Sequence, residues 1–150
     1  MKKSLLAFAI VCTSAMFSSC TPASSPSPSY TMTATAGGTS FSGTKCMAAE
    51  VSPNLGISAT TVTGGVAGPP QINISVVNWS GGTGTYTFGT VTAGTHFAQY
   101  IASSGSLTKT SSSGSVTITN VSSTEIKGTF NFICTDGTAI TGGSFTAERL

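Results

Sequence analysis

The chain contains few charged residues. Asp, Glu, Lys and Arg make up 7% of its 150 residues, whereas about 25% is usual in soluble domains. Lys2 and Lys3 lie in an N-terminal segment that we expect to be removed, and the other four basic side chains balance the four acidic ones. Without an excess of either sign, the sequence does not predict binding to nucleic acid. Ser, Thr, Asn and Gly must therefore supply most of the solvated surface.

The sequence also lacks an apolar run long enough to span a bilayer. The run from Leu5 to Phe17 has thirteen residues, and a membrane-spanning helix needs about 20. Two lysines before this run and two small residues after it, Ser18 and Ser19, are typical of an export signal that is cleaved. We therefore expect residues 1–19 to be a signal peptide.

Cys20 directly follows this boundary, in the sequence Phe17-Ser18-Ser19-Cys20. The stretch resembles the lipobox of bacterial lipoproteins, with Phe17 where leucine is usual. The resemblance implies that the Cys20 thiol carries diacylglycerol, whose acyl chains, such as palmitate, hold the protein on a membrane. No aspartate follows Cys20, which resembles the pattern of lipoproteins sorted to the outer membrane. The resemblance leaves open whether the domain faces the periplasm or the exterior.

Residues 21–29 contain three prolines and four serines and no charge. Such a segment cannot bury enough apolar surface to offset its ordering entropy, so we expect an extended tether. Together with Cys20 this tether spans residues 20–29. Residues 30–150 then form one domain, which is long enough to bury a core of its own.

Helical periodicity is absent from the domain. Apolar residues do not recur at the i, i+3, i+4 and i+7 spacing of an amphipathic helix. Short runs instead alternate apolar and polar residues and are separated by Gly, Pro, Asn and Asp, which indicates strands and turns. We predict an all-β fold, an antiparallel β-sandwich or small barrel of about eight or nine short strands, in which sequential neighbours mostly pair.

The clearest strand pattern covers residues 114–147 and predicts a three-stranded C-terminal β-meander. A two-residue turn at Asp136-Gly137, with both residues at positive φ, joins its last two strands. The side chains expected to face the core are Val116, Ile118, Ile126, Phe130, Phe132, Cys134, Phe145 and Ala147.

The earlier strands are shorter and less regular. We expect a chain break at Pro69-Pro70, and strands 71–79 and 95–102 carry apolar or aromatic groups on both faces, which favours central or ligand-facing positions. The predicted strands before the meander are 30–36 (at a sheet edge), 39–51, 57–62, 71–79, 85–91, 95–102 and a short one near Leu107.

Cysteines are scarce as well, and after processing only Cys46 and Cys134 remain beside Cys20. In an exported, oxidising compartment the two could form a disulfide. The 88-residue separation would stabilise the fold by about 4–5 kcal/mol in the chain-entropy model. Strict alternation places Cys46 opposite Phe41, so pairing requires a change of phase near Gly43. Two buried free thiols are the alternative.

Residues suited to catalysis or metal binding are few. His96 is the one histidine, and two cysteines with one histidine do not complete a four-ligand metal set. A catalytic His96 would need a nucleophile and an orienting acid beside it. Asp136 belongs to a turn, and Glu50 with Glu125 would have to act as a carboxylate pair. The sequence therefore favours a protein without catalytic activity, cofactor or metal.

The aromatic residues offer one possible ligand surface. Flat rings beside amide side chains suit stacking on sugars. The candidate residues are Trp79, Tyr86, Tyr100, Asn78 and Gln99. In the alternative interpretation these rings fill the ends of the core.

The chain resembles the small all-β lipoproteins of Gram-negative bacteria, many of which are known only as domains of unknown function. The residues that carry this resemblance are the Cys20 signal, the Ser/Pro tether and the ending Lys127–Phe132, Asp136–Thr138 and Ile140–Phe145. It implies a lipid-anchored outer-membrane protein, and it supplies no catalytic or binding residues. We expect a structural or protein-interaction role in the cell envelope, with glycan or peptide binding as an alternative and an enzyme as a further one.

Overall fold

The computed structural model describes residues 29–150. The predicted signal peptide, the predicted lipidation site Cys20 and the predicted tether up to residue 28 lie outside the described residues. Within the described part, no helix has the length and the apolar character needed to cross a membrane.

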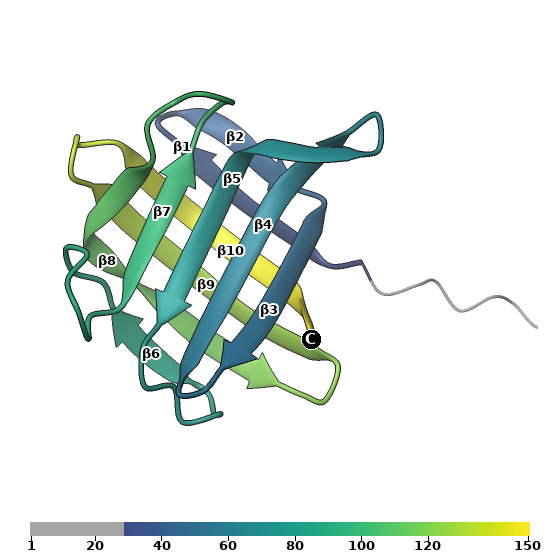
Figure 1. Cartoon of the computed structure of the whole chain (residues 1–150), viewed down its shortest axis with the longest axis vertical. Coiled ribbons are helices and arrows are strands. Elements are labelled where there is room, and N and C mark those ends of the chain that lie inside the picture. The colour runs from purple at the N-terminus through teal and green to yellow at the C-terminus, as the bar shows by residue number, and fades with distance from the viewer. Residues whose placement is uncertain (1–28) are drawn as a thin grey trace, which may run out of the picture.

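Residues 29–150 form ten strands and contain no helix (Figure 1), which confirms the predicted all-β class. The strands are β1 Thr31–Ala36, β2 Thr39–Gly43, β3 Lys45–Val51, β4 Asn54–Thr63, β5 Val66–Val76, β6 Gly84–Thr87, β7 Phe97–Ile101, β8 Lys109–Val121, β9 Glu125–Cys134 and β10 Ala139–Arg149.

The strands form two layers that cross each other (Figure 1). The four-stranded sheet has the order β7-β5-β4-β3, and the six-stranded sheet has the order β6-β8-β9-β10-β1-β2. Pairing of β7 with β8 and of β10 with β3 joins the two sheets at their sides. Seven strands therefore close into a small barrel, which was one of the two predicted architectures.

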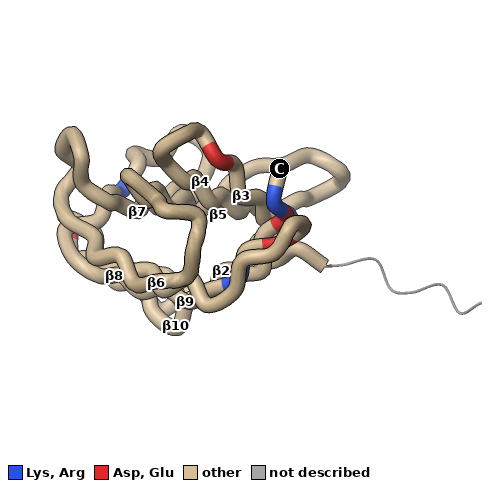
Figure 2. Tube along the Cα trace, turned by 90° about the horizontal axis from the view of Figure 1, so that it is seen from below, with Lys and Arg blue, Asp and Glu red and all other residues tan. Residues whose placement is uncertain are grey.

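The junction between β10 and β3 is parallel, unlike the other pairings among the described strands. Glu148 pairs with Met47, and Arg149 pairs with Ala48. The Arg149 side chain fastens this end: its Nε donates to Glu50 Oε1 at 2.6 Å, and a terminal guanidinium nitrogen donates to the Ser122 carbonyl at 2.7 Å. Figure 2 shows that several of the few charged positions gather here, beside the C-terminus.

The predicted C-terminal meander is confirmed and forms the middle of the six-stranded sheet. All eight side chains expected to face inward along β8, β9 and β10 are buried. Their phenylalanine rings, together with Phe88, form a continuous series through the core. Successive centroids lie 6.0, 6.2 and 6.3 Å apart in the order Phe88, Phe132, Phe130, Phe145.

Two glycines let these rings pack directly on the backbone of the neighbouring strand. Gly128 lies opposite Phe145, and Gly143 lies opposite Phe130. A Cβ at Gly143 would come within 2.6 Å of the Phe130 ring, and one at Gly128 within 2.7 Å of the Phe145 ring. Each glycine therefore provides the space that a ring on the next strand fills.

Hydroxyl groups make up much of the outer face of the six-stranded sheet, as the low charge of the sequence requires. One cross-strand row contains only serine and threonine, and hydroxyls within it bond to each other, Thr33 to Ser144 at 3.1 Å and Thr85 to Thr117 at 2.9 Å. From β2 to β6 this row reads Ser42, Thr33, Ser144, Thr129, Thr117 and Thr85.

The predicted strand 39–51 is in fact two strands. β2 ends at Gly43, Thr44 and Lys45 are both exposed, and Cys46 faces the core like Phe41. The change of phase expected near Gly43 is therefore present, as a break between strands that belong to different sheets. A single alternating pattern cannot continue across that break.

Several other predicted boundaries were wrong. β1 is not an edge strand, because it lies between β2 and β10; the edges are β2 and β6. Sequential neighbours mostly pair, as predicted, and β5 is an exception because it pairs with β7. The region around Leu107 is an exposed loop rather than a strand.

β5 continues through Pro69 and Pro70, where we expected a break. The two prolines lie at a register shift between Thr60 and Thr61 of the β4–β5 pair. A proline has no N–H to donate to a ladder, so a bulge is a position that tolerates it. The strand can therefore pass a dipeptide that usually ends one.

Replacing Gly128 with alanine tests the packing of rings against glycine. The added Cβ would press against the Thr117 carbonyl oxygen and the Phe145 ring. We expect Gly128→Ala to lower the free energy of unfolding by about 1–3 kcal/mol, as overpacking does. Gly68→Ala is the matched control, because a Cβ at this strand glycine meets no atom within 4 Å. Equal urea midpoints for the two variants would contradict the prediction.

Candidate functional site

Trp79 belongs to the core and not to an open surface. β5 ends at Val76, and Trp79, in the following loop, is 8% exposed. Its indole N–H donates to the Gly82 carbonyl at 2.9 Å, and the Arg149 guanidinium lies 6.0 Å from the ring centroid. Both the polar edge and the face of the ring are therefore already occupied within the protein.

The other predicted aromatic residues do not complete a ligand surface either. Tyr86 and Tyr100 are half-buried and pack against the core, and Tyr86 meets the His96 ring edge-on at 5.3 Å. Asn78 is exposed with φ of 52°, and its backbone N–H donates to Asn54 Oδ1. For Trp79, Tyr86 and Tyr100 the structure corresponds to the alternative interpretation, in which the rings pack at the core. Of the residues proposed for a ligand surface, Gln99 alone faces a groove, described below.

The residues considered for catalysis are held in separate interactions. His96 Nδ1 accepts a hydrogen bond from the Val77 backbone N–H at 3.0 Å. Glu50 pairs with Arg149, and Glu125 pairs with Lys127 at 2.8 Å. Among residues 29–150, His, Cys, Asp and Glu side chains form no group of three or more that could hold a metal ion.

Asp136 stabilises the turn between β9 and β10. Hydrogen bonds from Lys109 Nζ and from the backbone and hydroxyl of Thr138 lower the pKa of its carboxyl to about 2. Gly137 has φ of 83°, but Asp136 does not share the positive φ that we predicted. The aspartate instead forms a side-chain turn with the N–H two residues later.

Cys46 and Cys134 are both buried and both free. They lie in different sheets, Cys46 on β3 and Cys134 on β9. Burial raises the pKa of the Cys46 thiol to about 12, and burial also raises the pKa of Cys134. The structure therefore corresponds to the free-thiol alternative and not to the disulfide.

A shallow groove of about 320 Å³ lies on the outer face of the four-stranded sheet. Two adjacent rows of outward-facing residues cross β3, β4, β5 and β7 and form it. One row is Ala49, Gly56, Ser75 and Phe97, and the other is Met47, Ser58, Asn73 and Gln99.

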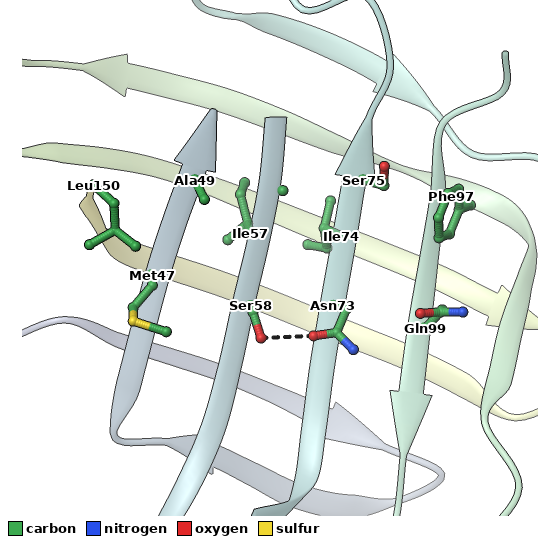
Figure 3. A pocket seen from close by; sticks show the side chains of 11 residues that line it. Met47, Ala49, Ile57, Ser58, Asn73, Ile74, Ser75, Phe97, Gln99 and Leu150 are labelled. Carbon is green, nitrogen blue, oxygen red and sulfur yellow. Dashed lines mark hydrogen bonds between the residues drawn. The ribbon is translucent and has the colours of Figure 1, made fainter. Parts of the chain in front are cut away.

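Side-chain size shapes this groove (Figure 3). Small residues such as Gly56 and Ser75 lie in the middle, Met47 and Leu150 stand at one end, and Phe97 stands at the other. A large residue on each outer strand therefore encloses a low central floor. None of the side chains that line the groove is charged.

A polar strip runs along one side of the groove. Ser58 Oγ and Gln71 Nε2 both donate to Asn73 Oδ1 at 2.8 Å. Figure 3 shows the nitrogen of Asn73 on the side that faces Gln99. Gln99 makes no side-chain hydrogen bond to any of residues 29–150, so its amide can bind a ligand.

Sequence reasoning identified Gln99 but missed Phe97, Asn73 and Met47. One signal was present: strands 71–79 and 95–102 were noted for apolar groups on both faces, and β5 and β7 both contribute to the groove. The groove itself depends on which residues lie opposite one another across four strands, and this register is not visible in a single strand.

A family model described as a domain of unknown function (DUF6252) matches residues 29–147. The chain belongs to this family. No curated protein and no solved structure matches the chain. The DUF6252 match starts at Ser29 and includes all four strands of the groove.

Alkylation tests the state of the two thiols in the DUF6252 domain. We expect iodoacetamide at pH 8 to label neither Cys46 nor Cys134 in the folded protein, because burial limits access and suppresses the thiolate. In guanidinium chloride without reductant both should be labelled, as mass spectrometry would show. Labelling that requires prior reduction would contradict the free-thiol state.

Proposed function

We propose that this protein is a lipid-anchored, non-catalytic binding module of the bacterial outer membrane. It attaches to the membrane through Cys20, and its barrel binds a component of the cell envelope in the groove on the four-stranded sheet. The groove is the observation that carries the proposal, because the core residues, the ion pairs and the thiols described above all have structural roles.

The difference between the two outer faces supports a binding role for the groove. The six-stranded sheet is solvated by a row of serine and threonine hydroxyls. The four-stranded sheet places Met47, Ala49 and Phe97 at equivalent outward positions. The same chain can evidently cover a sheet with hydroxyls, so folding does not require these apolar residues. Clustered apolar residues on a surface commonly mark interaction sites.

The position of the N-terminal end of the domain is compatible with an anchor. The Tyr30 carbonyl accepts a hydrogen bond from the Cys46 N–H at 3.2 Å, so the chain enters the barrel beside β3, at the junction of the two sheets. A tether that arrives at this junction leaves the outer faces of both sheets free. An extended tether of residues 20–29 would reach about 30 Å at roughly 3.1 Å per residue.

Replacing Cys20 with serine tests the anchor. In a Gram-negative host grown with an alkyne-tagged palmitate, we expect the full-length protein to carry the tag and to sediment with membranes. Cys20→Ser should lose the tag and appear in the soluble envelope fraction. Cys12→Ser is the matched control, since it removes a cysteine of the predicted signal peptide and should change neither result. Membrane fractionation of Cys20→Ser identical to that of the wild type would contradict attachment through Cys20.

Site-specific cross-linking tests the binding face. With p-benzoyl-phenylalanine at position 49 in the groove, ultraviolet irradiation of intact cells should give an adduct of higher mass. The same residue at position 129, on the hydroxyl-covered face, should give none, although both positions point outward from strands. Adducts at position 129 alone, or at neither position, would contradict binding through the groove.

A further inference from the structure

We propose that the ligand of the groove is a neutral oligosaccharide chain, with Phe97 as the stacking residue and Gln99 and Asn73 as its hydrogen-bonding partners. This inference rests on the proposed binding function and names its ligand class. It uses residues on the outer face of the sheet and none of the buried rings.

The absence of charged side chains in the groove restricts the class of ligand that it can bind. The groove is lined by apolar, hydroxyl and amide side chains. An anionic ligand would lose hydration on entering the groove and would gain no cationic side chain in return. The groove therefore favours a neutral molecule over phosphate-bearing or carboxylate-bearing ones.

The arrangement of apolar and polar groups fits a sugar ring. Pyranose rings carry C–H groups on their faces and hydroxyls around their edges. The groove presents the Phe97 ring and the small floor of Gly56 and Ser75 in one row, and the amides of Asn73 and Gln99 in the row beside it. A ring that stacks on Phe97 would therefore direct its hydroxyls toward the two amides.

The amides can both donate and accept. Asn73 Oδ1 is occupied by Ser58 and Gln71, which leaves its Nδ2 as a donor toward Gln99. The free amide of Gln99 offers a donor and an acceptor. A sugar hydroxyl also both donates and accepts, so adjacent hydroxyls could satisfy these groups together.

The middle strands of the groove cannot recognise an extended peptide by strand pairing. β4 and β5 are paired on both sides along the groove, and β7 pairs with β5 and β8. Strand addition needs the free backbone edge of a sheet, and the groove exposes a face instead. Recognition must therefore come from side chains, as in sugar binding.

Two variants change the groove in opposite ways. Phe97→Ala removes the stacking ring. Gly56→Val fills the floor, and it should fold well because a Cβ at Gly56 meets only the Ala49 carbonyl, at 3.9 Å. Matched controls away from the groove are Ile133→Ala, an exposed apolar residue of β9, and Gly68→Val, where a Cβ meets nothing within 4 Å.

The binding experiment uses the full-length chain carrying Cys20→Ser, exported and purified without detergent. The probes are maltohexaose, cellohexaose, xylohexaose and N-acetylchitohexaose, with hexagalacturonate as the charged counterpart and an uncharged decapeptide pool as the protein-like one. Calorimetry measures affinity, and NMR follows the side-chain amides of Asn73 and Gln99.

We expect at least one neutral hexasaccharide to bind and to shift both amide signals. Phe97→Ala and Gly56→Val should each weaken that binding by roughly tenfold or more, as loss of an aromatic stacking contact does, while both controls keep the wild-type affinity. The proposal is overturned if only the peptide pool or hexagalacturonate binds, if no probe binds, or if the two groove variants bind the sugar like the wild type.

These outcomes separate the ligand class from the proposed function. Peptide binding that is lost in Gly56→Val would retain the groove as a binding site and reject the sugar. Sugar binding that is unaffected by Phe97→Ala and Gly56→Val would reject the groove itself. The anchor at Cys20 is decided by fractionation alone and depends on neither result.

Discussion

Closure of the barrel depends on the last strand, β10. Along one side β10 pairs with β9, and along the other it pairs first with β1 and then, in parallel, with β3. The parallel part covers two residue pairs, so Arg149 adds contacts that hold it: an ion pair to β3, a bond to the carbonyl of Ser122 and a position over the Trp79 ring. Because this junction fixes the four-stranded sheet over the core, it also decides which face of that sheet remains outside.

Inside the barrel, large rings on one strand pack against glycines on the neighbouring strand. Phe130 and Phe145 each lie opposite a glycine, so the rings approach the backbone of the next strand and form one series with Phe132 and Phe88. Gly128 and Gly143 are therefore packing positions within strands and not turns. The core thus depends on two patterns. Apolar and polar residues alternate along each strand, and a phenylalanine on one strand lies opposite a glycine on the next.

Features that depend on residues close together in the sequence were predictable, and features that depend on distant strands were not. The meander of β8 to β10 was predictable with its inward-facing residues, because alternation and short turns act within a few residues. The inward orientation of Cys46 required a change in the alternation near Gly43. The break at Thr44 supplies this change, because the chain there passes from one sheet to the other. Trp79 was placed in a predicted strand 71–79, but that strand ends at Val76, before Asn78 takes a positive φ. Barrel closure and the groove depend on register between distant strands, which no local pattern contains.

The two outer faces of the barrel differ in a way that supports the proposed binding role of the groove. Both faces are made by the same alternation, and both must be solvated with very few charges. The six-stranded sheet achieves this with Ser and Thr, whose hydroxyls bond to each other across strands. If stability were the only requirement, the four-stranded sheet could do the same. It instead combines a partly exposed Phe97, an unbonded Gln99 amide and a glycine floor within two adjacent rows. None of these is a core residue, and their shared location is the basis of the proposed binding role.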